Sequence, residues 1–263
     1  MSVSILINTC DKYEKIWPVF FKEFQRFWPK CEYKVYLNTE TKSYSCDGLD
    51  INPLNIRTDV REAAWSGRLE DALKRIDSEF IITILDDFIF EEQVDADELE
   101  KCVLRMEQDY SIGVVQFTCG KGTYGRCKNY PEWEEQMPGD KYRINCQAAL
   151  WNKSYFLKLL RRFESPWEFE KYGSFRSRRY KEKVYAWASE ENYVFTYNWG
   201  KPIIGGKWNL DEVERLENKL GIKFDLSGRE CIRNYYETIK LKGKPKRDLR
   251  WCIKKISHIR SLI

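Results

Sequence analysis

The first 118 residues alternate short β-rich runs with segments of helical spacing, and this order restricts the fold more than any other feature of the chain. The β-rich runs lie at residues 2–8, 32–40, 49–56 and 79–87, and apolar residues recur at helical spacing over 16–28 and 68–76. Strands joined through a helix pair in parallel. The sequence therefore predicts an α/β fold on a doubly wound, mostly parallel sheet, in which Ser66 caps the second helix.

The rest of the chain continues this pattern less regularly. A helix is predicted over 95–108 and a strand over 112–118, and the Gly-, Pro- and charge-rich stretch 119–142 is typical of a long surface loop. Further elements are predicted in this order: a strand or turn entering a helix at 144–163, a strand within 184–199, a turn at 202–208 and a helix at 209–221.

The supply of reactive side chains restricts the chemistry. His258 is the only histidine, which argues against His-rich zinc sites and against Ser–His or Cys–His catalysis. The nine cysteines are scattered, odd in number and without CxxC spacing, so we interpret them as reduced thiols. Catalysis is therefore expected to use carboxylates, basic groups and an oxygen-ligated metal ion.

The net charge of +4 is concentrated at the C-terminal end. Residues 241–263 carry eight Lys or Arg and one Asp, a charge of +7, which leaves −3 (+4 minus +7) for residues 1–240. Apolar residues at helical spacing share this segment, and basic amphipathic helices bind anionic membrane surfaces. Two alternatives are a terminal helix docked on the domain with its basic face in solvent, and a nucleic-acid contact, which the negative remainder disfavours.

No run approaches the roughly 20 apolar residues that a membrane span requires. The N-terminal stretch MSVSILINTC has no basic region followed by an apolar core and a cleavage site. We therefore expect the protein to remain in the cytosol.

Two adjacent carboxylates, Asp86 and Asp87, interrupt the apolar run ITILDDFIF. Burying charge is costly unless a cation or hydrogen bonds offset it. Consecutive strand residues point to opposite faces, so both can serve one site only where the strand ends and the backbone turns. There, beyond the carboxyl end of a strand, the pair can hold Mg²⁺ or Mn²⁺ together with a substrate diphosphate. The alternative is a turn or helix-cap carboxylate followed by a surface residue.

Five segments, taken in order, carry a resemblance to a known family. They are NTCDKY, YLNTE, WSGRLEDALKRIDSEFIITILDDFIF, NCQAALWNKSYFLKLLRRFESPWEFE and IIGGKW, and they fall within residues 3–208. The set resembles bacterial glycosyltransferases of the GT-A fold, of the type found in capsular or surface polysaccharide clusters. LDDF resembles a variant of the metal-binding DxD motif of that fold and departs from it by having Asp-Asp-Phe. The resemblance implies that Asp86 and Asp87 hold Mn²⁺ or Mg²⁺ and that Asp86 also contacts the donor.

The resemblance further implies that a nucleotide-sugar donor binds across the N-terminal half. Thr9, Asp11 and Tyr13 would lie near its base and ribose, and Asn38 follows another strand at the same edge. Arg68 would reach the diphosphate or the base, since a guanidinium fork suits phosphate. Each has an ordinary alternative: a helix cap for Asp11, packing for Tyr13 and a solvated charge for Arg68.

The candidates for the acceptor side lie later in the chain. In an inverting transfer a carboxylate deprotonates the acceptor hydroxyl, and Glu168 or Glu170 is the candidate base, because aromatic neighbours can raise a carboxyl pKa. A Glu pair on a solvated strand or turn is the alternative. Gln147 is a candidate contact of donor sugar or acceptor, or a structural amide. Lys207 follows two glycines and is a candidate diphosphate contact, or part of a plain turn.

These inferences predict three regions: a donor-binding half at 1–118, an acceptor-side half of the same domain at 119–226, and a basic helical tail at 227–263. The predicted function is transfer of a sugar from a nucleotide-diphosphate donor to a glycan or lipid-linked glycan hydroxyl. A metal-dependent nucleotidyl or phosphoryl transferase and a non-catalytic glycan- or membrane-binding module are the alternatives. No nucleic-acid partner is expected, and peripheral contact with the inner membrane face is expected through 241–263.

Overall fold

A computed structural model of the chain describes residues 3–57, 65–119, 127–188 and 194–235. The chain divides into two compact units, Met1–Tyr197 and Asn198–Ile263, each described here by itself. The basic segment 241–263 lies outside the described residues, so its predicted helix and membrane contact stay predictions.

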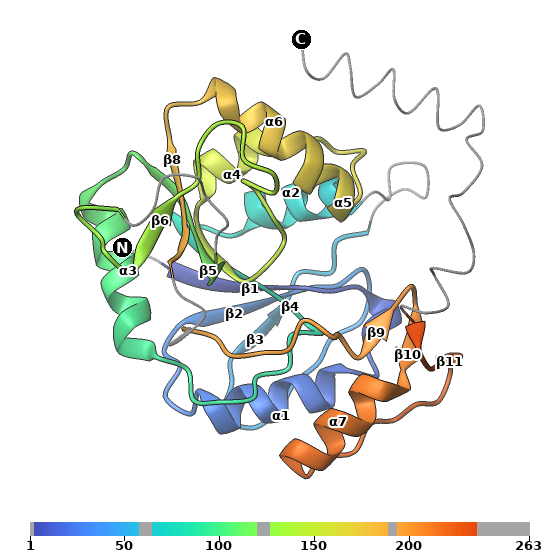
Figure 1. Cartoon of the computed structure of the whole chain (residues 1–263). Helices are drawn as coiled ribbons and strands as arrows, with labels where there is room; N and C mark the ends of the chain where they lie inside the picture. Colours follow the sequence, from blue (N-terminus) through green and yellow to red (C-terminus); the bar gives the residue numbers. More distant parts are fainter. Residues whose placement is uncertain (1–2, 58–64, 120–126, 189–193, 236–263) are drawn as a thin grey trace, which may run out of the picture. The chain divides into compact units, whose positions relative to one another are not determined.

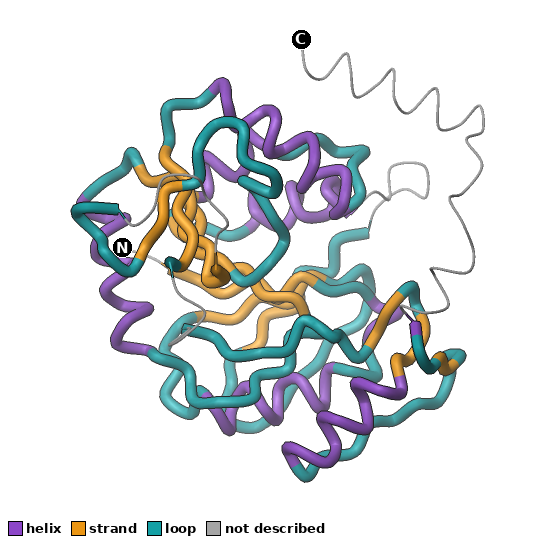
Figure 2. Tube along the Cα trace, in the orientation of Figure 1, coloured by secondary structure: helices purple, strands orange, loops and turns teal. Residues whose placement is uncertain are grey.

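An eight-stranded sheet forms the centre of the first unit (Figures 1 and 2). Its strands in chain order are β1 Val3–Asn8, β2 Lys34–Asn38, β3 Ile51–Pro53, β4 Phe80–Leu85, β5 Ile112–Cys119, β6 Trp133–Glu135, β7 Ala149–Asn152 and β8 Lys183–Trp187. In space they lie in the order β3-β2-β1-β4-β7-β5-β8-β6. Only β7 and β6 run antiparallel to their neighbours. This confirms the predicted mostly parallel α/β fold.

The strand order reverses direction between β1 and β4. From β1 the chain moves outward through β2 to β3, and then returns to place β4 on the other side of β1. Asn8, the last residue of β1, pairs with Leu85, the last residue of β4. The residues that follow the two strands therefore flank the crevice where open α/β sheets bind their ligands.

Helices cover both faces of this sheet. They are α1 Trp17–Phe27, α2 Trp65–Arg75, α3 Ala96–Gln108 and α4 Lys153–Leu159. Apolar residues of α2 and α4 pack in one buried cluster with inward-facing side chains of β1, β4, β5, β7 and β8. Helix α1 lies on the opposite side of the sheet (Figure 1) and packs its aromatic face inward, with Phe20 and Phe24 both against Phe90.

Two elements differ from the sequence prediction, and a helical run lies where no element was predicted. The described part of helix α2 already includes Trp65, so Ser66 lies inside the helix, where its hydroxyl contacts the backbone of Glu164 instead of capping the helix. Strand β6 lies within the predicted loop 119–142, because Trp133 is fully buried there. Residues 166–179 form a continuous run of short helical turns: α5 Pro166–Glu168, the π-helical η2 Phe169–Gly173, α6 Ser174–Arg176 and the 3₁₀ turn η3 Ser177–Arg179.

In its described residues, 198–235, the second unit carries a small three-stranded sheet and one helix. Its elements are β9 Ile203–Ile204, β10 Lys207–Asn209, α7 Leu210–Leu220 and β11 Cys231–Ile232. Gly205 and Gly206 join β9 to β10 with φ of 58° and 79°, a backbone that side chains disfavour, which explains the glycine pair. Trp208 is fully buried and contacts the ring of Phe224. The predicted turn and helix are both present.

Candidate active site

The two adjacent carboxylates lie where strand β4 ends. Leu85 is its last residue, and a turn closes over Asp86 and Asp87 because Phe88 N donates to Leu85 O at 3.1 Å. The backbone therefore turns at the pair, which meets the geometric condition for both to serve one site. Asp86 and Asp87 are only 3% and 8% exposed.

Asp86 is held by donors from the β1–α1 connection. Its Oδ2 accepts hydrogen bonds from the Thr9 hydroxyl and, at 3.2 Å, from Trp17 Nε1. Trp17 Nε1 also lies 2.9 Å from Thr9 Oγ1, so the three side chains form a closed triangle. Hydrogen bonds of this kind favour a carboxylate in its ionised form, which offsets part of the cost of its burial.

Arg68 brings helix α2 to the same place. One guanidinium nitrogen donates to the backbone oxygen of Thr9, and another pairs with the carboxylate of Glu40, just beyond β2. Burial lowers the pKa of Arg68, while the nearby Cys10, Asp11 and Asp86 oppose that shift. An arginine remains charged under such conditions. The site thus contains a buried, permanent positive charge beside the Asp86 carboxylate.

Asp11 organises the loop after β2. The 3₁₀ turn η1 Asp11–Tyr13 places its carboxylate against the backbone N–H groups of Glu40, Thr41 and Lys42, at 2.9 to 3.3 Å. Glu40 returns a bond, because its Oε2 accepts from Asp11 N at 2.6 Å. Asp11 therefore links the ends of β1 and β2. Tyr13 closes η1 and is half-buried.

Asn38 and Gln147 connect to the residues around Asp86 and Asp11 through other side chains. Asn38 is fully buried, and its amide donates to Asn8 Oδ1 at 2.8 Å, so it joins the last residues of β2 and β1. Gln147 Oε1 accepts from the Tyr197 hydroxyl at 3.2 Å. The Tyr197 ring stacks on Phe88, next to the aspartate turn, with ring centroids 4.3 Å apart.

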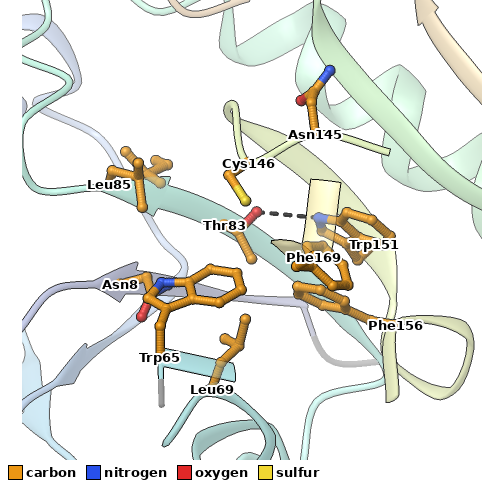
Figure 3. Close-up of a pocket in the computed structure, with 11 residues that line it drawn as sticks. Asn8, Trp65, Leu69, Thr83, Leu85, Asn145, Cys146, Trp151, Phe156 and Phe169 are labelled. Atoms are coloured by element: carbon orange, nitrogen blue, oxygen red, sulfur yellow. Dashed lines mark hydrogen bonds between the residues drawn. The ribbon is translucent and has the colours of Figure 1, made fainter. Parts of the chain in front are cut away.

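A small pocket lies next to the carboxyl ends of β1 and β4 (Figure 3). Apolar side chains from α2, β7, α4 and η2 surround it, and Asn8, Thr83 and Asn145 supply polar groups. The Thr83 hydroxyl accepts from Trp151 Nε1 at 3.2 Å. The cavity volume of about 20 Å³ is enough for about one water molecule or a methyl-sized group.

The two candidate bases have different surroundings. Glu168 forms a capping box with Ser165, whose N–H and hydroxyl both donate to Glu168 Oε2, at 2.9 and 2.7 Å. Glu170 Oε1 instead accepts from the backbone N–H of Cys146, one of the residues that line the pocket. Glu170 is therefore the one of the pair that is tied to the pocket wall.

Lys207 belongs to the second unit, where it forms an ion pair with Glu230. Its predicted diphosphate contact stays a prediction. No disulfide joins the eight described cysteines to one another.

The aspartate pair supplies two oxygen-donor side chains for a divalent cation. Among the described residues, no group of three or more His, Cys, Asp or Glu is placed to hold a metal ion. Two carboxylates nevertheless fit the way Mg²⁺ is commonly bound, through one or two carboxylates plus substrate phosphates and water. The donor set therefore fits a cation that arrives with a diphosphate, and not a cation enclosed by protein ligands alone.

Sequence reasoning missed two residues of the cluster. Glu40 stands in the quoted segment YLNTE, directly beyond β2, and an acidic residue at a strand's carboxyl end is the signal that could have identified it. Trp17 fits the apolar spacing of α1, so the sequence predicts only that its ring packs in the interior. Nothing in that pattern indicates that its indole N–H donates to Asp86.

Comparisons with known proteins find only distant structural likeness. No family model and no curated protein matches the chain. The solved structure of residues 1–349 of Staphylococcus aureus TarS is 12% identical, with 74% of this chain and 59% of that chain covered and a TM-score of 0.48. The same TarS fragment in complex with UDP-GlcNAc is 12% identical, covering 75% and 58%, with a TM-score of 0.48.

The galactosyltransferase LgtC, solved with donor and acceptor sugar analogues, is 12% identical, covering 69% of this chain and 65% of that one, with a TM-score of 0.36. The chain thus spans less than two thirds of the length of each of these structures. At such identity and similarity, neither site residues nor substrates transfer from them. Within the described part of the chain, no helix has the length and apolar character needed to cross a bilayer.

Proposed function

We propose that the chain is a glycosyltransferase of the GT-A type, which moves a sugar from a nucleotide-diphosphate donor to a glycan or lipid-linked glycan hydroxyl. The observation that carries the proposal is the convergence of Thr9, Arg68 and Asp86 at the crevice between β1 and β4. This crevice is where open α/β sheets bind ligands, and it combines a buried guanidinium with two carboxylates. The motif resemblance points to the same residues.

Each donor-site residue has a role in this proposal. Arg68 binds the diphosphate, for which its planar donor fork is suited, and it would exchange its ion pair with Glu40 for the phosphate oxygens. Thr9, Asp11 and Tyr13 flank the base and ribose, on the connection that follows β1. Asn38 holds the end of β2 beside that connection.

Asp86 and Asp87 are proposed to hold Mn²⁺ or Mg²⁺ together with the donor diphosphate. When bound, such a cation offsets the negative charge that develops on the leaving diphosphate. The contacts of Asp86 with Thr9 and Trp17 support a second role for it, in which it fixes the position of the connection that receives the nucleotide.

Glu170 is the better supported of the two candidate bases, because its partner Cys146 lines the pocket, whereas Glu168 serves the capping box of α5. A base near the pocket would deprotonate the acceptor hydroxyl as it attacks the anomeric carbon. Gln147, which is half-buried and accepts a hydrogen bond from Tyr197, is proposed to contact donor sugar or acceptor, and Lys207 to approach the diphosphate.

The biological setting belongs to the proposal as well. We propose that the protein acts in the synthesis of a capsular or surface polysaccharide, in the cytoplasm, with residues 241–263 in contact with the inner membrane face. Within the chain, residues 1–118 would form the donor half and residues 119–226 the acceptor half. The charge of +7 on residues 241–263 supports the membrane contact.

A thermal-shift screen of nucleoside diphosphates and nucleotide-sugars, with and without Mn²⁺, tests the function. We expect at least one diphosphate to stabilise the protein, and to do so more strongly with Mn²⁺; a ligand at 100 times its Kd adds about 2.7 kcal/mol. Stabilisation by nucleoside triphosphates alone would favour a nucleotidyl transferase. Stabilisation by no nucleotide would contradict the proposal.

A further inference from the structure

The helical run 166–179 carries an exposed stripe of aromatic and basic side chains. The exposed positions follow one another at spacings of three or four residues and comprise Trp167, Lys171, Phe175, Arg178 and its neighbour Arg179. We call these five residues the aromatic–basic stripe. Trp167 is 77% exposed and Phe175 is 43% exposed. A π-helical turn takes more residues than an α-helical one, so the segment η2 keeps positions four apart on one face.

The opposite face of this run is fixed in the interior. Arg176 is 1% exposed and makes two hydrogen bonds to the fully buried carboxylate of Glu164, at 2.7 and 2.6 Å. Ser177 is fully buried and accepts from Arg143 at 2.6 Å. Phe169 lines the pocket next to the carboxyl ends of β1 and β4 (Figure 3). The helix therefore cannot rotate to bury the stripe without losing a buried ion pair.

The charged residues at the exposed positions of the run are all cations, whereas Glu168 and Glu170 are half-buried. The acidic residues of the run and its approach are engaged elsewhere: Glu164 by Arg176, Glu168 by Ser165 and Glu170 by the backbone of Cys146. The stripe itself holds three cations. Arg178 lies 4.9 Å above the ring of Phe175, so aromatic and cationic groups form one surface.

We propose that the aromatic–basic stripe docks on an anionic lipid surface. Exposed aromatic rings combined with Lys and Arg, and no acid, suit the headgroup region of a bilayer, where the rings enter the interface and the cations meet lipid phosphates. Because Phe169 of the same helix reaches the pocket, docking would hold the pocket close to the bilayer. The contact requires no nucleotide and no transfer chemistry.

Vesicle co-sedimentation of the full chain tests this inference without nucleotide. The vesicles contain phosphatidylcholine, either alone or mixed with phosphatidylglycerol. Wild type is expected to bind the anionic vesicles only, and the double variant Trp167→Ser/Phe175→Ser to bind them at least about tenfold more weakly. A second double variant, Lys171→Gln/Arg178→Gln, is expected to lose a similar factor, since it removes two of the stripe's cations.

The matched control is Leu104→Ser/Tyr110→Ser, which removes two large hydrophobic side chains, 47% and 50% exposed, from α3 and the loop after it. It is expected to bind as wild type does. Three results would each overturn the inference: no binding by wild type, equal binding to neutral and anionic vesicles, or unchanged binding by both stripe variants, as the 241–263 segment alone would cause. Circular dichroism melting checks that all variants remain folded.

Discussion

At the scale of single residues, the site depends on how a buried carboxylate is stabilised. Asp86 is almost fully buried, and it is surrounded by the Thr9 hydroxyl, the Trp17 indole N–H and the charge of Arg68. Hydrogen bonds to a charged group contribute more than those between neutral groups, roughly 1.5–3 kcal/mol each. These contacts connect β1, α1, α2 and β4 at one point.

A double-mutant cycle between Trp17→Phe and Asp86→Asn measures this coupling. We expect each single variant to lower the free energy of unfolding, and the pair to lose less than the sum by about 1–2 kcal/mol, because both remove the same bond. The measurement is urea unfolding followed by circular dichroism. Trp151→Phe serves as the control, since its indole donates to the neutral Thr83, and it should combine additively with Asp86→Asn. Additive behaviour of Trp17→Phe would show that the contact does not stabilise the carboxylate.

Several of the candidate residues that sequence reasoning found are polar side chains at or just beyond the ends of apolar strands. Asp86, Asp87, Asp11 and Asn38 have that pattern, and β1, β2 and β4 end where their runs end. A hydrogen-bond partner that contributes only one atom leaves no such pattern in the sequence. The indole nitrogen of Trp17 is an example, because its ring satisfies the helix spacing by packing alone.

At the scale of elements, strongly periodic segments were predictable and irregular ones were not. Strand β4 and helix α3 match their predictions to within a few residues, since each has a clear apolar period. The helical run 166–179 keeps no single helix geometry, because it changes from α to π, back to α and then to 3₁₀, and it includes Gly173. Strand β6 was not predicted, because it lies in a polar segment and only one of its residues, Trp133, is buried.

The ion pair between Glu164 and Arg176 is expected to hold this irregular run in place. Both side chains are at most 1% exposed, so removing one leaves an uncompensated buried charge. We predict that Arg176→Met lowers the free energy of unfolding by about 3–5 kcal/mol. The double variant Glu164→Met/Arg176→Met should lose clearly less than the single one, because no charge remains buried. Urea unfolding measures both, and a single variant as stable as the double would contradict the prediction.

At the scale of the whole molecule, the order of strands and helices in the first half was enough to predict the crevice between β1 and β4. The positions of β5 to β8 depend on pairings between distant segments, such as β7 between β4 and β5, which local patterns do not encode. The division of the chain after Tyr197 was not predicted for the same reason. The residues proposed to bind the donor lie mainly in the part whose topology the sequence predicts best.

The central claim is that the carboxyl end of β4 binds a nucleoside diphosphate through Asp87 and a divalent cation. Isothermal titration calorimetry tests it, with the diphosphate that stabilises the wild type most and with Mn²⁺ present. The control variant, Asp50→Asn, removes an exposed carboxylate just before β3. This position is at the amino end of a parallel strand, whereas Asp87 follows the carboxyl end of β4. We predict that Asp87→Asn raises the Kd at least about tenfold, a loss of about 1.4 kcal/mol, and that Asp50→Asn leaves it unchanged. Equal affinity of wild type and Asp87→Asn in the presence of Mn²⁺ would contradict the claim.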